Sequence, residues 1–137
     1  MKTIRFVLII SLVGLLSACN LGQAAPTIAP TLDLPTAEIT APTNNREVVD
    51  GTVFDIEILA RDSSAGIAKV ELLVDENLIN EVTPEGQPVP VFAATMNWRA
   101  QGAGQHIIEV VPYRADGTRG DAARVTIIVL ADENTGS

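Results

Sequence analysis

The sequence predicts an all-β fold, an antiparallel β-sandwich of about seven short strands. Three observations support this prediction. Apolar and polar residues alternate in several short runs, which is the period of a half-buried strand. Clusters of Gly, Pro, Asn and Asp separate these runs at intervals of about ten residues, as in β-sandwiches. No segment keeps the period of an amphipathic helix.

The predicted strands fill the middle and the end of the chain. They span residues 37–40, 53–60, 68–74, 78–82, 91–99, 106–113 and 125–130. Residues 83–90 contain three prolines, which a central strand does not tolerate, so this segment is predicted to be a loop. The predicted core consists of Phe54, Ile56, Ile58, Val70, Leu72, Phe92, Met96, Trp98, Ile108, Val110, Ile127 and Val129.

The first nineteen residues have the order of an export signal. Lys2 and Arg5 precede an apolar run at 6–16, and small residues follow. The run is shorter than the roughly 20 residues of a transmembrane helix. The ending Leu16-Ser17-Ala18-Cys19 resembles the bacterial lipobox. The resemblance implies that residues 1–18 are removed and that Cys19 is acylated. It also implies that the protein is anchored to the outer face of a bacterial membrane.

The segment after the lipobox is predicted to be a disordered spacer. Pro26, Pro30 and Pro35 recur among Thr and Ala, which favours extended polyproline II geometry. Fully extended, the spacer would reach roughly 50 Å. The expected organisation is a signal peptide at 1–18, a lipidated cysteine and linker at 19–36, a sandwich at 37–132 and a disordered tail at 133–137.

Charge and cysteine content exclude several classes of function. Without Lys2 and Arg5, the chain has 7 basic and 17 acidic residues, a net charge of −10. Such a surface repels phosphate backbones, so we expect no nucleic-acid partner. Cys19 is the only cysteine, so the fold contains no disulfide and lacks the ligands for a zinc site. We expect no cofactor.

Several segments resemble a bacterial immunoglobulin-like (Ig-like) domain over roughly residues 36–132. The segments that show it are 39–44, 60–62, 66–75, 97–98, 104–108 and 116–117, with Gly-Ile-Ala-Lys-Val-Glu-Leu at 66–72 the most specific. The resemblance implies a spacer, adhesion or carbohydrate-associated module of a surface protein. Asp75-Glu76-Asn77 stands where the family usually has an Asp-Gly turn, which leaves the turn type open.

No group of residues predicts catalysis or metal binding. His106 is the only histidine, and no nucleophile and orienting acid lie near it in sequence, so we expect a hydrogen-bonded residue at the domain rim. Asp62 with Ser63 and Ser64, or Asp116 with Asp121, are candidate calcium loops. Both lack the ligand spacing of an EF-hand, which favours solvated acidic loops.

Two further features have both a functional and a structural interpretation. Arg119-Gly120-Asp121 is the tripeptide that integrins recognise, in a predicted hairpin loop where it would be displayed. Gly and Asp are also common turn residues. Trp98 could stack on a sugar, but its phase with Met96 predicts the core.

The last strands carry apolar residues on the face that should meet solvent. If three strands lie side by side in one sheet, these residues form a candidate partner face: Leu73, Ile107, Val111, Tyr113, Ile128 and Leu130. Alternatively, the spacer residues Ile28, Leu32 and Leu34 cover this face, or the residues reflect only β-propensity.

The sequence therefore predicts a non-enzymatic cell-surface lipoprotein. Its Ig-like domain would mediate binding, adhesion or spacing at the cell envelope, with a protein or glycan partner. One alternative is an accessory subunit of an envelope complex. Another is a carbohydrate-binding or hydrolase-associated module.

Overall fold

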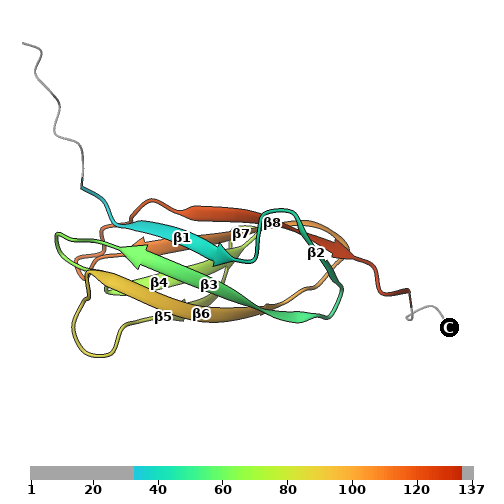
Figure 1. Cartoon of the computed structure of the whole chain (residues 1–137), viewed down its shortest axis with the longest axis horizontal. Coiled ribbons are helices and arrows are strands. Elements are labelled where there is room, and N and C mark those ends of the chain that lie inside the picture. Colours follow the sequence, from blue (N-terminus) through green and yellow to red (C-terminus); the bar gives the residue numbers. More distant parts are fainter. Residues whose placement is uncertain (1–32, 134–137) are drawn as a thin grey trace, which may run out of the picture. The chain divides into compact units, whose positions relative to one another are not determined.

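The computed structural model describes residues 33–133, which form a sandwich of two β-sheets (Figure 1). One sheet has three strands in the order β1-β3-β6, and the other has five in the order β2-β8-β7-β4-β5. The described residues include no helix that is long and apolar enough to cross a membrane. The all-β sandwich predicted from the sequence is confirmed.

The strands follow the alternation of the sequence closely. They are β1 (Thr36–Ala41), β2 (Arg46–Val49), β3 (Val53–Arg61), β4 (Lys69–Val74), β5 (Asn77–Val82), β6 (Val91–Arg99), β7 (Gly104–Tyr113) and β8 (Ala123–Leu130). β3 and β6 pair antiparallel along their whole length, with Phe54 opposite Trp98 and Ile56 opposite Met96. Because side chains alternate between the two faces of a strand, these four point together into the space between the sheets.

The core consists mainly of the predicted residues. Ile56, Val70, Leu72, Ile108, Val110 and Ile127 are fully buried. Trp98 packs edge-on against Phe54, with ring centroids 5.8 Å apart and an interplanar angle of 82°. Phe92 is an exception, since it is only half-buried near the start of β6, which lies at the edge of its sheet. The burial of Trp98 supports its assignment to the core rather than to a sugar-stacking surface.

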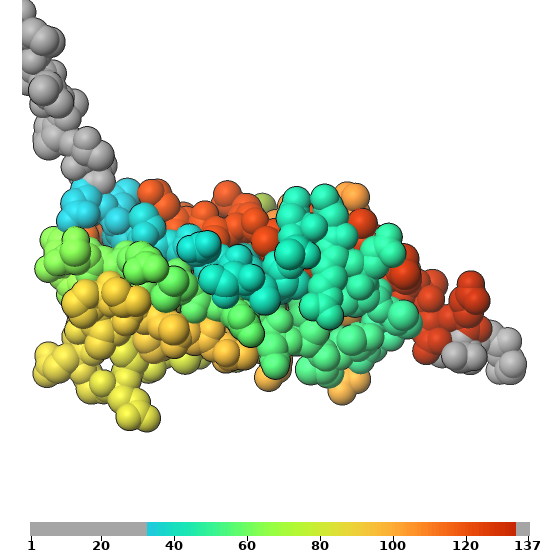
Figure 2. All heavy atoms as spheres, viewed as in Figure 1, coloured from blue at the N-terminus to red at the C-terminus, as the bar shows by residue number. Residues whose placement is uncertain are grey.

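One strand was not predicted. β2 has only four residues, and only Val48 among them is buried, so it is too short to show the alternation. It pairs with β8 in parallel, whereas all the other strand pairs among the described residues are antiparallel. The chain therefore leaves the three-stranded sheet after β1 and joins the edge of the five-stranded sheet. In Figure 2 this segment (teal) lies beside the last part of β8 (red).

The turn between β4 and β5 has a defined type. Asp75 and Glu76 both have positive φ, at 49° and 68°. Two consecutive residues with positive φ are the mark of a type I′ hairpin turn, whose twist matches that of the strands. The sequence left this turn type open because the usual glycine is absent.

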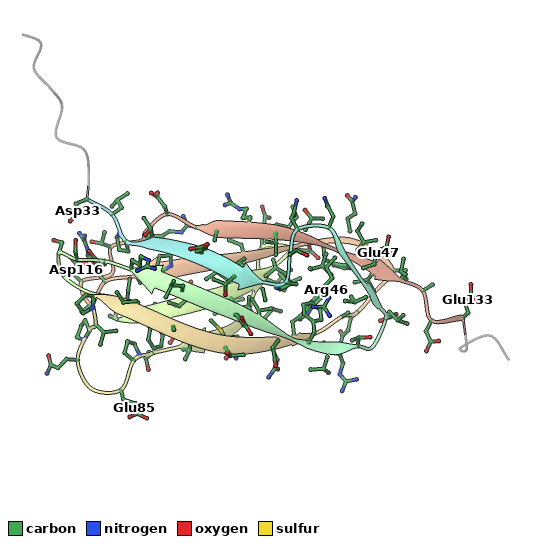
Figure 3. The ribbon with its side chains drawn as sticks, in the orientation of Figure 1. Asp33, Arg46, Glu47, Glu85, Asp116 and Glu133 are labelled. Carbon is green, nitrogen blue, oxygen red and sulfur yellow. The ribbon has the colours of Figure 1, made fainter. Side chains whose placement is uncertain are left out.

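The described chain enters and leaves at opposite ends of the sandwich. Asp33 lies at the same end as Asp116, and Glu133 lies at the other (Figure 3). We call these the N-terminal end and the far end. The boundary with the predicted linker differs from expectation, since Pro35 is fully buried and its carbonyl accepts a hydrogen bond from the Asp121 amide at 2.7 Å. Residues 33–36 thus pack with the domain.

Candidate functional site

The candidate partner face lies on the outer side of the five-stranded sheet. β4, β7 and β8 are neighbours there, as the prediction required. Ile107 and Leu130 are 51% and 43% exposed. Leu73, Tyr113 and Ile128 are half-buried. Val111 is only 1% exposed, so the expectation that it meets solvent is wrong.

Val111 is buried because charged side chains surround it on the outer face. It stands opposite Glu71 of β4, between Glu109 and Tyr113 of its own strand. Arg119 forms a β-bridge with Tyr113 and donates to Glu109 at 2.8 Å, so its chain extends across this position. Long charged side chains commonly cover apolar surface with their methylene groups.

Ion pairs occupy the same half of the sheet. Lys69 Nζ contacts Glu71 at 2.6 Å and Glu81 at 3.0 Å, and it lies 4.8 Å from the centroid of the Tyr113 ring. The hydrogen bonds to both carboxylates raise the pKa of Lys69. Glu109 also accepts from Arg124, at 2.9 Å and 3.0 Å. This half of the face, toward the N-terminal end, therefore pairs its own charges.

The half of the same face toward the far end carries exposed apolar side chains. Val49 of β2 lies opposite Leu130 of β8, and Ile128 lies opposite both Glu47 and Gln105. Ile107 is diagonal to Ile128, a separation at which large side chains touch. We call Val49, Ile107, Ile128 and Leu130 the far patch. Three of them are more than 40% exposed.

His106 sits beside this patch and holds the β4–β5 turn. Its Nδ1 lies 2.6 Å from Asp75 Oδ2 and its Nε2 lies 2.7 Å from the carbonyl oxygen of Gly102. Both neighbours are acceptors, so the arrangement favours the doubly protonated ring. Burial disfavours the charged ring, but the two hydrogen bonds outweigh it and raise the pKa of His106. Asp75 also accepts from the Ile107 amide at 2.9 Å. The hydrogen-bonded rim residue expected from the sequence is found, with a partner 31 positions away.

The calcium loops are better explained as hydrogen-bonded structure. Arg114 donates to both oxygens of Asp62, at 2.6 Å and 2.9 Å, and the Ser64 amide donates to one of them. The Arg114 hydrogen bond holds the pKa of Asp62 at about 2, despite burial. Asp116 caps its own turn by accepting from the Thr118 amide. Among residues 33–133, no three His, Cys, Asp or Glu side chains are grouped so that they could hold a metal ion.

The Arg119-Gly120-Asp121 tripeptide is not displayed at a hairpin tip. Gly120 is buried and its amide donates to the Pro112 carbonyl at 2.8 Å. Arg119 is bound to Glu109 on the sheet, and Asp121 pairs with Thr36. The expected position at a hairpin tip is therefore wrong, although Arg119 and Asp121 are themselves exposed.

The predicted lipid-attachment residue, Cys19, lies outside the described residues. Its acylation stays a prediction from the lipobox at 16–19.

Solved structures with a similar fold come from several bacterial and archaeal proteins. Fibronectin(III)-like modules of Clostridium thermocellum CbhA match with a TM-score of 0.61 and 28% identity, covering 74% of this chain and 49% of theirs. The CARDB domain of the Pyrococcus furiosus PF1109 protein matches with a TM-score of 0.56 and 17% identity, covering 74% and 99%. A mutant of the SrpA adhesin from Streptococcus sanguinis matches with a TM-score of 0.51 and 15% identity, covering 76% and 59%.

This chain thus spans about half of the CbhA structure that it matches. No curated protein matches the chain. A family model described as a bacterial Ig domain matches residues 35–110, from Pro35 to the buried middle of β7. That match includes β1 to β6, most of β7 and more than half of the chain. The chain therefore belongs to the bacterial Ig domain family.

Proposed function

We propose that the protein is a non-enzymatic cell-surface lipoprotein whose Ig domain binds a partner at the cell envelope. The domain is tethered through acylated Cys19, and the linker places it away from the membrane. The observation that carries the proposal is the separation of the two ends. The chain enters at Asp33, whereas the exposed far patch lies toward the opposite end.

The first described residues are held against the sandwich by several contacts at its N-terminal end. Arg114 donates to the carbonyl oxygen of Asp33 at 2.6 Å while it also binds Asp62. Pro35 is buried against Gly120. These contacts hold Asp33 and Pro35 at the N-terminal end of the sandwich. An acylated linker attached at this end would leave the far end free for a partner to approach.

The first experiment tests the tether. Mass spectrometry of the N-terminal peptide should show a mature chain that begins at Cys19 and carries acyl groups. Two or more acyl chains hold a protein stably on a membrane, whereas one is marginal. A Cys19→Ser variant should move from the membrane fraction to the soluble fraction. An unmodified Cys19, or a mature chain that starts elsewhere, would refute the lipoprotein proposal.

The second experiment tests binding in cells. A photo-crosslinking residue at Ile107 should capture an envelope component, and one at Thr95 on the outer face of the other sheet should not. Equal crosslinking at both positions would contradict a specific binding surface. Crosslinks to one integral envelope protein, recovered in stoichiometric amounts, would favour an accessory subunit of a complex.

A further inference from the structure

The far patch differs from the rest of its sheet in the charged side chains that lie around it. Glu47 lies opposite Ile128, and the Asp50 amide donates to the Leu130 carbonyl at 2.8 Å. Glu76 lines a hollow with Ile107. Asp132 and Glu133 follow Leu130 and line a second hollow with Val49. Glu47, Glu76, Asp132 and Glu133 therefore lie beside the apolar side chains, and Arg124 also lines the hollow at Ile107.

Glu47 and Glu76 are not neutralised as other carboxylates on the same face are, since none of the ion pairs among residues 33–133 involves them. The negative charge of Asp50 helps to raise the pKa of His106. Nearby cations are already engaged, since Arg124 binds Glu109 and His106 binds Asp75. Arg46 lies 5.9 Å from the centroid of the Phe54 ring. The far patch thus keeps a negative margin around an apolar centre.

The other half of the face serves as an internal comparison. There Lys69, Arg119 and Arg124 meet Glu71, Glu81 and Glu109, and apolar Val111 is covered. One sheet therefore carries a half that pairs its own charges and a half in which Glu47 and Glu76 form no ion pair beside exposed apolar side chains. An interface commonly has an apolar centre and a polar rim whose potential complements that of the partner.

We propose that the far patch docks a protein surface that is apolar at its centre and basic at its margin. This inference rests on the proposed function and adds the chemistry of the partner. Apolar side chains of the partner cover Val49, Ile107, Ile128 and Leu130. Its Lys or Arg side chains approach Glu47 and Glu76. The electrostatic attraction between the two surfaces weakens as the salt concentration rises, because these charges are exposed.

Two other occupants fit the patch less well. A second copy of the chain would bring two acidic margins together, which like-charge repulsion opposes. An anionic membrane surface is repelled for the same reason.

The test uses the whole mature chain with a Cys19→Ser change. This variant carries no acyl group and needs no detergent, whose micelles would themselves bind an amphipathic peptide. The probe is a short peptide of alternating Leu and Lys, titrated into nitrogen-15-labelled protein. We expect the amide chemical shifts of Val49, Ile107, Ile128 and Leu130 to change as the peptide binds. We expect weaker binding when salt is raised well above 0.1 M, where the screening length falls below about 10 Å. A Ser-Lys peptide tests charge alone, and a Leu-Glu peptide tests apolar contact alone. Both should bind at least roughly fivefold more weakly, about 1 kcal/mol.

Matched variants locate the binding. Val49→Thr with Ile107→Thr should weaken binding of the Leu-Lys peptide roughly fivefold or more. Val91→Thr with Val53→Thr, which are 52% and 51% exposed on the other sheet, should leave it unchanged. Glu47→Gln with Glu76→Gln should weaken binding mainly at low salt. Glu57→Gln with Asp55→Asn provides the matched control on β3.

The outcomes separate this inference from the proposed function. Equal binding of the Ser-Lys and Leu-Lys peptides, or equal effects of the test and control variants, would overturn the assigned chemistry. So would self-association that Val49→Thr abolishes, because the occupant would then be a second copy. Each of these results would leave an acylated Cys19 and crosslinking in cells intact. Loss of acylation, in contrast, would refute the proposed function and not the surface chemistry.

Discussion

Gly120 lies directly against Pro35, so closely that a Cβ at position 120 would come within 2.7 Å of the Pro35 Cβ and still nearer to its carbonyl oxygen. The neighbouring Asp121 amide donates to that same oxygen at 2.7 Å. The first residues of the domain are thus held by backbone contact with the segment before β8. Glycine is required at position 120 because only hydrogen fits there.

A Gly120→Ala change should therefore destabilise the domain strongly. Overpacking against backbone costs about 3 kcal/mol when neighbours cannot yield. Gly51→Ala is the matched control. No heavy atom lies within 4 Å of the Cβ position at Gly51, and its φ is +84°. It should cost only about 1 kcal/mol of backbone strain. Urea unfolding of both variants measures the difference, and equal losses would contradict the tight contact at Pro35.

Asp62→Asn should remove a buried ion pair with Arg114. Asp62 is 4% exposed, and an amide can satisfy only part of the guanidinium. We expect a loss of about 2–3 kcal/mol near neutral pH. The pKa of Asp62 is about 2 in the folded protein, below its usual value of 3.8, so the pair stabilises above the unfolded pKa and this contribution is lost as pH falls toward 2.

The free energy of unfolding, measured between about pH 2 and pH 7, tests the sign of the pH dependence that Asp62 contributes. The wild type should lose more stability than Asp62→Asn over the acid half of this range. Glu57→Gln on the exposed face of β3 is the control and should behave as wild type. Parallel acid curves for wild type and Asp62→Asn would show that Asp62 is not charged in the fold.

His106 should give the domain the opposite pH dependence. Its folded pKa is raised, so the stabilisation is fully present below the unfolded value of about 6.5 and is lost as pH rises through the folded pKa. Unfolding of the wild type should therefore become easier from near neutral to alkaline pH. His106→Gln should flatten the curve in this window. A wild-type stability that rises with pH there would contradict the proton on both ring nitrogens.

Trp98→Ala should be among the more destabilising core changes. The side chain is 8% exposed and contacts the rings of both Phe54 and His106. Removal of a buried aromatic side chain costs about 3–5 kcal/mol. Denaturant midpoints measure the effect. A loss below about 1 kcal/mol, which is typical of exposed positions, would restore the sugar-stacking interpretation.

Val111→Thr tests the division of the outer face. The change keeps the shape of the side chain but buries a hydroxyl, which costs about 1–3 kcal/mol at a position that is 1% exposed. Ile107→Thr, at 51% exposure, should change stability by less than about 0.5 kcal/mol. Thermal or urea unfolding compares the two. Similarly small losses of stability for both variants would show that Val111 is accessible to solvent and that the ion-paired half of the face does not cover it.

The sequence by itself determined the features that depend on local periodicity. Alternation in residues 53–60 placed Phe54, Ile56 and Ile58 in the core, and burial confirms each. A period of two residues is a property of a single strand, so it needs no knowledge of the partner strand. The same argument located seven strands and their turns. The resemblance at 66–72 identified the family, which the match at 35–110 now shows.

Only the tertiary structure decided which distant residues meet. The partners Asp62 and Arg114 are 52 positions apart, and Asp75 and His106 are 31 apart, so no spacing in the sequence signals either pair. Val111 has the phase of an exposed residue, yet it is buried because Arg119 and Glu71 of β4 cover it. β2 is too short to show an alternating pattern, and it forms because it can pair with β8. Burial on an outer face depends on the neighbours that the fold supplies, and those neighbours come from other strands.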